Sequence, residues 1–179
     1  IVVCNYNYEG YIAKAIEFYS EALQIAEAGL ADSDPGVRAL AVTGNNLAVG
    51  LEGVGHRTPQ QTDFMLLAAR SALKYWALAG TWAEHSVAHY RLSKSSFAAG
   101  LYVEALEEAM SCLAMCKSND AGAYDLFWAN EALATVTGVT KPEASLEYLE
   151  QMRVLLASVG DGLRESCEVR LRELTRSAE

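Results

Sequence analysis

Apolar residues recur at helical spacing along nearly the whole chain, and short runs of Gly, Pro and small polar residues interrupt them. The first stretch shows the pattern, because from Ile12 to Ala26 apolar side chains fall at i, i+3, i+4 and i+7. No segment alternates apolar and polar residues over the length of a strand. The pattern predicts an all-α protein, with helices over 11–29, 35–53, 59–79, 82–99, 102–117, 120–136, 142–158 and 163–176.

Capping residues support several of these boundaries. Asp34 precedes Pro35 and Thr58 precedes Pro59, so each polar side chain can cap a helix whose first turn contains the Pro. Thr140 and Glu143 have the spacing of a capping box, in which each side chain bonds the other residue's backbone N–H. We therefore expect helices to begin after Asp34, Thr58 and Thr140, and also after Asp120.

Charge and hydrophobicity exclude several classes of protein. Of the 179 residues 51% are hydrophobic, which excludes a disordered chain, and 14 basic against 23 acidic residues give a net charge of −9. This charge disfavours nucleic-acid binding, and no apolar run reaches the ~20 residues that cross a bilayer. We expect a single domain over 1–179 that binds neither nucleic acid nor membrane. Because residue 1 is Ile rather than Met, we also expect the chain to be the ordered part of something longer.

The number and spacing of the cysteines indicate in which cellular compartment the protein lies. The four cysteines, at positions 4, 112, 116 and 167, do not form the dense framework of a small secreted domain, so we expect reduced thiols and a cytoplasmic protein. Cys112 and Cys116 lie four positions apart on a predicted helix. They represent either half of a tetrahedral metal site or two small buried apolar residues.

The sequence lacks the motifs of catalysis and cofactor binding. His85 and His89 lie one helical turn apart, but Ser86 occupies the position where a zinc protease has its Glu, and no third ligand is marked. No Ser lies in a Gly-x-Ser-x-Gly elbow, and no Gly-rich run is followed by the Lys-Ser/Thr of a phosphate loop. We expect no enzyme activity, no cofactor and no bound metal.

Two blocks of the sequence repeat 90 positions apart. Gly10–Leu23 and Gly100–Leu113 each have a Gly, an Ala five positions later and a Leu at the end. Three further segments end in a small residue at matching positions: Asn45-Asn46-Leu47-Ala48, His89-Tyr90-Arg91-Leu92-Ser93 and Trp128-Ala129-Asn130-Glu131-Ala132. Together these blocks resemble the tetratricopeptide repeat (TPR), most closely the longer units of kinesin light chain.

The resemblance implies a TPR-like solenoid, a right-handed α-α superhelix of about eight helices in antiparallel pairs. Its units would span 1–34, 35–80, 81–119 and 120–160, and a polar capping helix would span 161–179. Small residues let paired helices approach closely in such arrays. Here they would be Ala48, Ser93 and Ala132 on first helices and Ala15, Ala105 and Ala144 on second helices.

The concave face of such an array binds peptides, and first helices supply its side chains. By register the positions that packing leaves free are Asn7, Asn45, Glu52, Tyr90, Lys94 and Phe97. An Asn can bond the N–H and C=O of an extended peptide, whereas aromatic residues at helical spacing often belong to the core instead. The expected function is a scaffold for a protein or peptide partner. The alternative is a regulatory module of a larger protein that senses a small molecule or peptide, and a homodimer is compatible with both.

Overall fold

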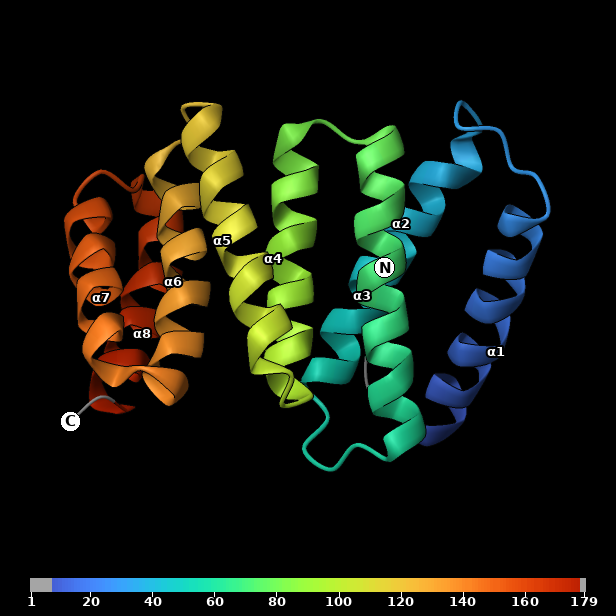
Figure 1. The fold of residues 1–179 in the computed structure, drawn as a ribbon, viewed down its shortest axis with the longest axis horizontal. Helices are drawn as coiled ribbons and strands as arrows, with labels where there is room; N and C mark the ends of the chain where they lie inside the picture. Colours follow the sequence, from blue (N-terminus) through green and yellow to red (C-terminus); the bar gives the residue numbers. More distant parts are fainter. Residues whose placement is uncertain (1–7, 178–179) are drawn as a thin grey trace. The chain divides into compact units, whose positions relative to one another are not determined.

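The computed structural model describes the backbone of residues 8–177 and the side chains from residue 11 onward, so Asn7 and Cys4 lie outside the described residues. Over the described range the protein has eight α-helices and no strand, which confirms the all-α prediction (Figure 1). The helices are α1 (Tyr8–Glu27), α2 (Pro35–Glu52), α3 (Pro59–Ala79), α4 (Trp82–Ala98), α5 (Tyr102–Ser118), α6 (Ala123–Thr140), α7 (Pro142–Leu156) and α8 (Asp161–Ser177).

The chain packs as two compact units. The first, Ile1–Thr81, contains α1 to α3, and the second, Trp82–Glu179, contains α4 to α8. Each unit has fully buried apolar residues of its own, such as Met65 in the first and Phe127 in the second.

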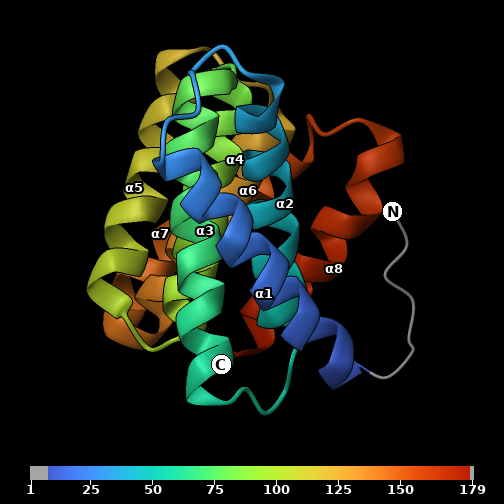
Figure 2. The same ribbon diagram turned by 90° about the vertical axis from the view of Figure 1, so that its right-hand side faces the viewer.

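In the first unit α2 and α3 form an antiparallel pair, and α1 runs obliquely across them (Figure 2). Tyr19 of α1 fixes this crossing. Its ring packs edge-on against Phe64 of α3 at a centroid distance of 6.1 Å, and its hydroxyl donates to the Leu40 carbonyl of α2 at 2.9 Å. Gly44 of α2 provides the room, because a Cβ there would collide with the Tyr19 hydroxyl and lie 2.7 Å from the Ala68 carbonyl oxygen of α3.

In the second unit α4 pairs with α5 and α6 with α7, α5 also packs on α6, and α8 lies against α6 and α7 (Figure 1). Ala105 is fully buried on α5, and the Ser93 hydroxyl of α4 donates to its carbonyl at 2.8 Å. Ala132 is likewise fully buried on α6, which confirms the predicted burial of these small residues. Ala15 on α1 and Ala144 on α7 are only partly buried.

Two predicted helix caps hold and two are wrong, although α7 does begin at Pro142 as predicted. Asp34 accepts from the Gly36 N–H at 2.7 Å, and Thr58 forms a reciprocal capping box with Gln61. Thr140, by contrast, is the last residue of α6 and its hydroxyl donates back to the Val136 carbonyl, so it does not cap α7. The predicted cap at Asp120 is also wrong, because this residue adopts a left-handed φ of 49° and α6 begins only at Ala123.

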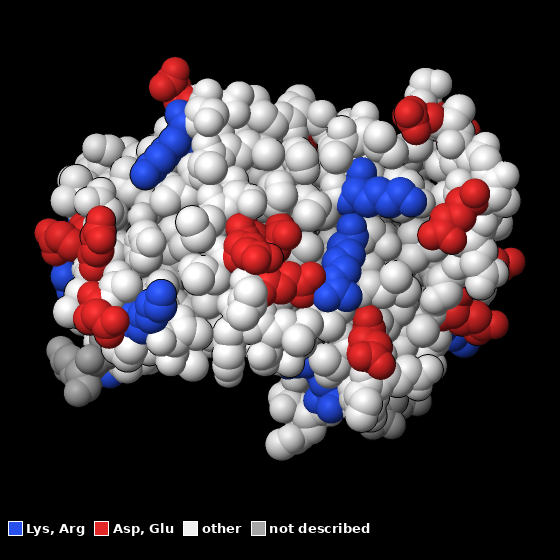
Figure 3. All heavy atoms as spheres, viewed as in Figure 1, with Lys and Arg blue, Asp and Glu red and all other residues white. Residues whose placement is uncertain are grey.

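The molecular surface in Figure 3 carries acidic side chains over both units, with basic ones interspersed and large uncharged areas between them. Over the described residues, no helix is both long and apolar enough to span a membrane.

Candidate binding site in the second unit

A pocket of about 300 Å³ opens between α4, α5 and α6. Two consecutive turns of α4 and the first two turns of α6 line the pocket, and α5 contributes the two cysteines of the lining. Its lining residues are Ser86, Val87, Tyr90, Arg91, Cys112, Cys116, Tyr124, Asp125, Trp128 and Ala129. The pocket therefore combines aromatic, thiol and charged side chains from three helices of one unit.

Three aromatic rings form much of this lining, and they meet edge to face. The Trp128 ring lies 6.1 Å from that of Tyr90 at an interplanar angle of 76°, and 6.1 Å from that of Tyr124 at 75°. Edge-to-face contacts of this kind hold aromatic rings in fixed orientations. The indole N–H of Trp128 is buried and has no hydrogen-bond partner among the described residues. The aromatic part of the pocket is thus a rigid, mainly apolar surface.

Tyr90 connects the pocket to a buried ionic cluster. Its hydroxyl donates to Glu131 Oε2 at 3.0 Å, and the Arg91 guanidinium and the Lys94 ammonium lie 5.6 Å and 5.9 Å from its ring centroid. Burial, the Glu131 charge and the hydrogen bond to Glu131 all raise the pKa of the Tyr90 phenol. The hydroxyl therefore remains a donor, and its ring remains in place, throughout the physiological pH range.

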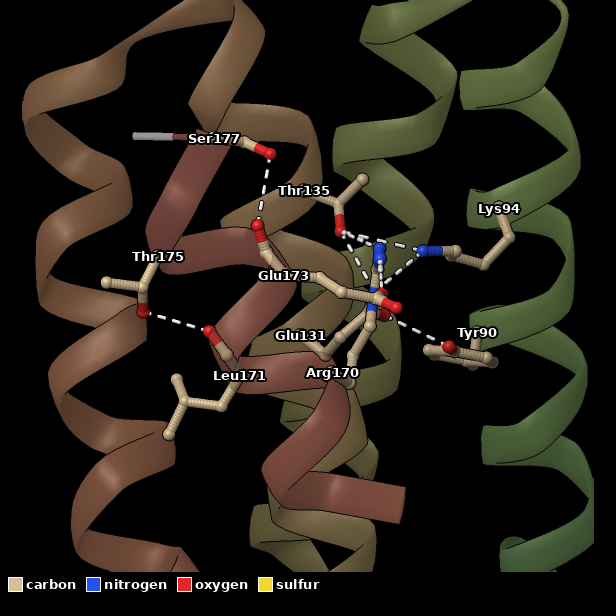
Figure 4. Close-up of polar contacts among 9 residues, drawn as sticks. All are labelled: Tyr90, Lys94, Glu131, Thr135, Arg170, Leu171, Glu173, Thr175 and Ser177. Carbon is tan, nitrogen blue, oxygen red and sulfur yellow. Dashed lines mark hydrogen bonds and ion pairs between the residues drawn. The ribbon is translucent and has the colours of Figure 1, made fainter. Parts of the chain in front are cut away.

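Glu131 is the centre of this cluster (Figure 4), and its side chain is fully buried. Its Oε1 atom accepts from Lys94 Nζ at 2.7 Å, from Arg170 Nε at 2.7 Å and from the Thr135 hydroxyl at 3.0 Å. Burial alone would raise the pKa of this carboxyl. The two cations outweigh that effect, and the pKa lies below its usual value. The cluster thus ties together α4, α6 and α8.

The cluster follows from short-range helix geometry on each element. Lys94 lies one turn after Tyr90 on α4, and Thr135 lies one turn after Glu131 on α6, so each pair shares a helix face. Arg170 approaches from α8 and also donates to Glu173 at 3.0 Å. Lys94 and Arg170 retain side-chain exposures of 18% and 28%, so both cations still reach solvent.

The two thiols of the pocket lie on one face of α5 and are hydrogen-bonded to each other, which raises the pKa of Cys112 and lowers that of Cys116. Both are buried and reduced, as is Cys167. Elsewhere on α4, His89 is hydrogen-bonded to Glu108 of α5 at 2.6 Å. Within the described part of the chain, no three His, Cys, Asp or Glu residues are arranged to hold a metal ion.

The residues that the sequence predicts on the concave, peptide-binding face lie in different places. Tyr90 and Lys94 come together on Glu131, whereas Phe97 packs against Tyr102 of α5 at a centroid distance of 5.6 Å and does not line the pocket. Asn45 and Glu52 are partly buried on α2 in the first unit. Asn7 lies outside the described residues.

Sequence reasoning missed three members of the cluster: Glu131, Thr135 and Arg170. Glu131 carries a weak signal, because it is a charged residue placed between the small residues Ala129 and Ala132 of a predicted packing segment. Arg170 carries none, because it is one of several charged residues that alternate along the predicted capping helix.

Comparison of the chain with models of known protein families, with curated proteins and with solved structures finds no match.

Proposed function

We propose that this chain is a TPR-like scaffold that binds a peptide segment of a partner protein through the pocket of the second unit. The observation that carries the proposal is the position of this pocket. It lies between α4 and α6, the first helices of two consecutive antiparallel pairs. In the array that the sequence resembles, first helices form the peptide-binding face.

The chemistry of the pocket suits a peptide side chain. A volume of about 300 Å³ is at the small end for ligand sites, and aromatic walls offer a large contact area with few freely rotating bonds. Arg91 and Asp125 place charges of both signs beside the aromatic rings. These groups can orient the backbone or a polar side chain of the bound segment.

The ionic cluster supports this proposal through preorganisation. Tyr90 is held by Glu131, and Glu131 is held by Lys94 and Arg170, so this wall needs no reordering when a ligand enters. Binding to an ordered surface avoids about 0.5–1.5 kcal/mol for each side chain that would otherwise be immobilised. On this proposal the protein acts in the cytoplasm, without enzyme activity of its own.

Selection of a phage-displayed peptide library on the full chain tests the proposal, followed by measurement of Kd for the selected peptides. Val87 lines the pocket and is 48% exposed, so Val87→Glu should fold normally and weaken binding at least tenfold. The matched control is Val154→Glu on α7, which is 62% exposed and outside the pocket, and it should bind within about twofold of wild type.

Selected peptides that bind Val87→Glu and wild type equally would refute the proposed site. If no peptide is selected, and a small-molecule library instead raises the melting temperature of wild type but not of Val87→Glu, the sensor alternative becomes the better description.

A further inference from the structure

The pocket of the second unit contains a carboxylate without a partner. Asp125 is the single carboxylate among the lining residues, and its side chain is partly buried in the first turn of α6. Within the described part of the chain it forms no hydrogen bond and no ion pair. Arg91, the other charged residue of the lining, is already engaged. The pocket therefore offers an unmatched negative charge to a ligand.

Two aromatic rings lie on the same face of α6 as this carboxylate. Tyr124 and Trp128 are one helical turn apart, and Asp125 is three positions before Trp128. Both rings are only partly buried and line the pocket, so a ligand can reach them. We call Tyr124, Asp125 and Trp128 the α6 corner.

The two rings of the α6 corner are oriented to enclose a cation. Their planes stand at 75° to each other, and their centroids are 6.1 Å apart. A positive charge centred over both ring faces would lie about 4–5 Å from each centroid, and cation–π contacts extend to roughly 6 Å. The corner thus combines two electron-rich ring faces with a full negative charge.

Tyr90 of α4 closes the pocket on the other side, but its ring is already matched with cations of the protein. Arg91 and Lys94 lie 5.6 Å and 5.9 Å from its centroid. Over the described residues, no Lys or Arg of the protein lies over the ring of Tyr124 or Trp128. The open position for a cation is therefore the α6 corner.

We propose that the α6 corner binds a trimethylammonium group, carried either by a trimethylated lysine side chain or by a small quaternary ammonium compound. This inference rests on the pocket proposed above for peptide binding and names the chemistry of the group that enters it. An unmethylated lysine has three N–H donors, and the aromatic corner has one carboxylate to accept from them, so entry would leave donors unpaired. A trimethylammonium group has no N–H and presents an apolar surface, so it enters without that cost.

Titration of the full chain with choline tests the role of charge. The comparison ligand is the neutral carbon isostere of choline, in which a tert-butyl group replaces the trimethylammonium group. The indole N–H signal of Trp128 in NMR spectra reports binding of both. We expect choline to bind about tenfold more tightly than the neutral alcohol, because only choline gains the cation–π and carboxylate contacts.

Asp125→Asn should weaken choline binding about fivefold or more and leave binding of the neutral alcohol within about twofold of wild type. The matched control is Asp161→Asn, since Asp161 also lies in the first turn of a helix, α8, but is 98% exposed and outside the pocket. This control should bind choline as wild type does.

A pair of ring variants provides an independent test. Tyr124→Phe keeps the aromatic ring and should bind choline within about twofold of wild type, whereas Tyr124→Leu removes the ring and should bind about fivefold more weakly or worse. Circular dichroism establishes that each variant is folded. Because Asp125→Asn and Tyr124→Leu alter different groups, a failure of one to fold leaves the other decisive.

The source of the group is identified with N-acetyl-trimethyllysine methylamide. Tighter binding of this probe than of choline would assign the group to a peptide side chain, and the reverse order would assign it to a small molecule. The proposal is overturned if neither probe binds, if choline and its neutral isostere bind equally, or if unmethylated N-acetyl-lysine methylamide binds as tightly as the trimethylated probe. Selected peptides that occupy the pocket without competing with choline would refute the trimethylammonium site alone. Choline binding without any selected peptide would refute peptide binding alone.

Discussion

Replacing Glu131 with Gln should destabilise the second unit strongly, although the two side chains have almost the same shape. The carboxylate is fully buried and accepts from Lys94 and Arg170, each at 2.7 Å. An amide in its place leaves two cations facing a neutral group inside the protein. It also turns one acceptor atom into a donor beside groups that are themselves donors.

The magnitude follows from the burial of the three partners. Removing one member of a buried ion pair costs about 3–5 kcal/mol. Lys94 and Arg170 keep 18% and 28% exposure, and Arg170 keeps its contact with Glu173 at 3.0 Å, so solvent and a second carboxylate compensate part of the loss. We expect a loss of about 2–4 kcal/mol, which for a unit of this size lowers Tm by roughly 10–20 °C.

Thermal unfolding of wild type and Glu131→Gln, followed by circular dichroism between pH 7 and pH 3, measures this effect. The pKa of Glu131 is lower in the folded protein than in the unfolded chain, so its stabilisation is complete above the unfolded value of about 4.3. It is lost as pH falls through the folded pKa, because wild type then also carries a neutral side chain. The difference in Tm should therefore be constant down to about pH 5 and shrink below about pH 4.

Glu150→Gln is the matched control. Glu150 pairs with Arg153 at 3.1 Å, but its side chain is 62% exposed, so the change should cost at most about 0.5 kcal/mol. If Glu131→Gln melts within a few degrees of wild type, or if its deficit does not diminish at low pH, the cluster does not stabilise the unit as argued.

Three further outcomes test the packing and the thiols. Gly44→Ala should destabilise the first unit by about 1–3 kcal/mol, because the new methyl group collides with Tyr19 and the α3 backbone. Its control is Gly50→Ala on the same helix, where a Cβ has no atom within 4 Å, so this change should stabilise the unit by about a few tenths to 1 kcal/mol. Denaturant unfolding measures both changes. Ala105→Leu should overpack the contact between α4 and α5 and cost about 1–3 kcal/mol, and an unchanged Tm would mean that this register is wrong. Thiol titration of the unfolded chain without reductant should find all four thiols free. In the native state the buried Cys112, Cys116 and Cys167 should react slowly. Two free thiols instead of four would contradict the proposal of a reduced, cytoplasmic protein.

The sequence by itself determined the helices and some of their ends, because these depend on neighbours within one turn. The caps at Asp34 and Thr58 bond groups only two or three residues away, so spacing alone predicts them. The prediction at Thr140 failed because α6 continues its own ladder further than expected, and the Lys141 N–H still donates to the Thr137 carbonyl at 2.7 Å. Two locally reasonable patterns competed there, and continuing α6 by one more turn adds backbone hydrogen bonds without the cost of starting a new helix.

The candidate site was predictable only in part, because sequence spacing reveals only contacts within one or two turns of a helix. Tyr90 and Lys94 are one turn apart on one helix, so their shared face follows from the period of the helix. Their common partner Glu131 is 41 and 37 positions away, and Arg170 is a further 39 positions beyond Glu131. Periodicity identifies which face of a helix is apolar, but it does not specify which charged residue of a distant helix meets that face. Only tertiary packing excludes water around Glu131, and that exclusion makes one carboxylate, among the many acidic residues of this chain, the electrostatic centre of its unit.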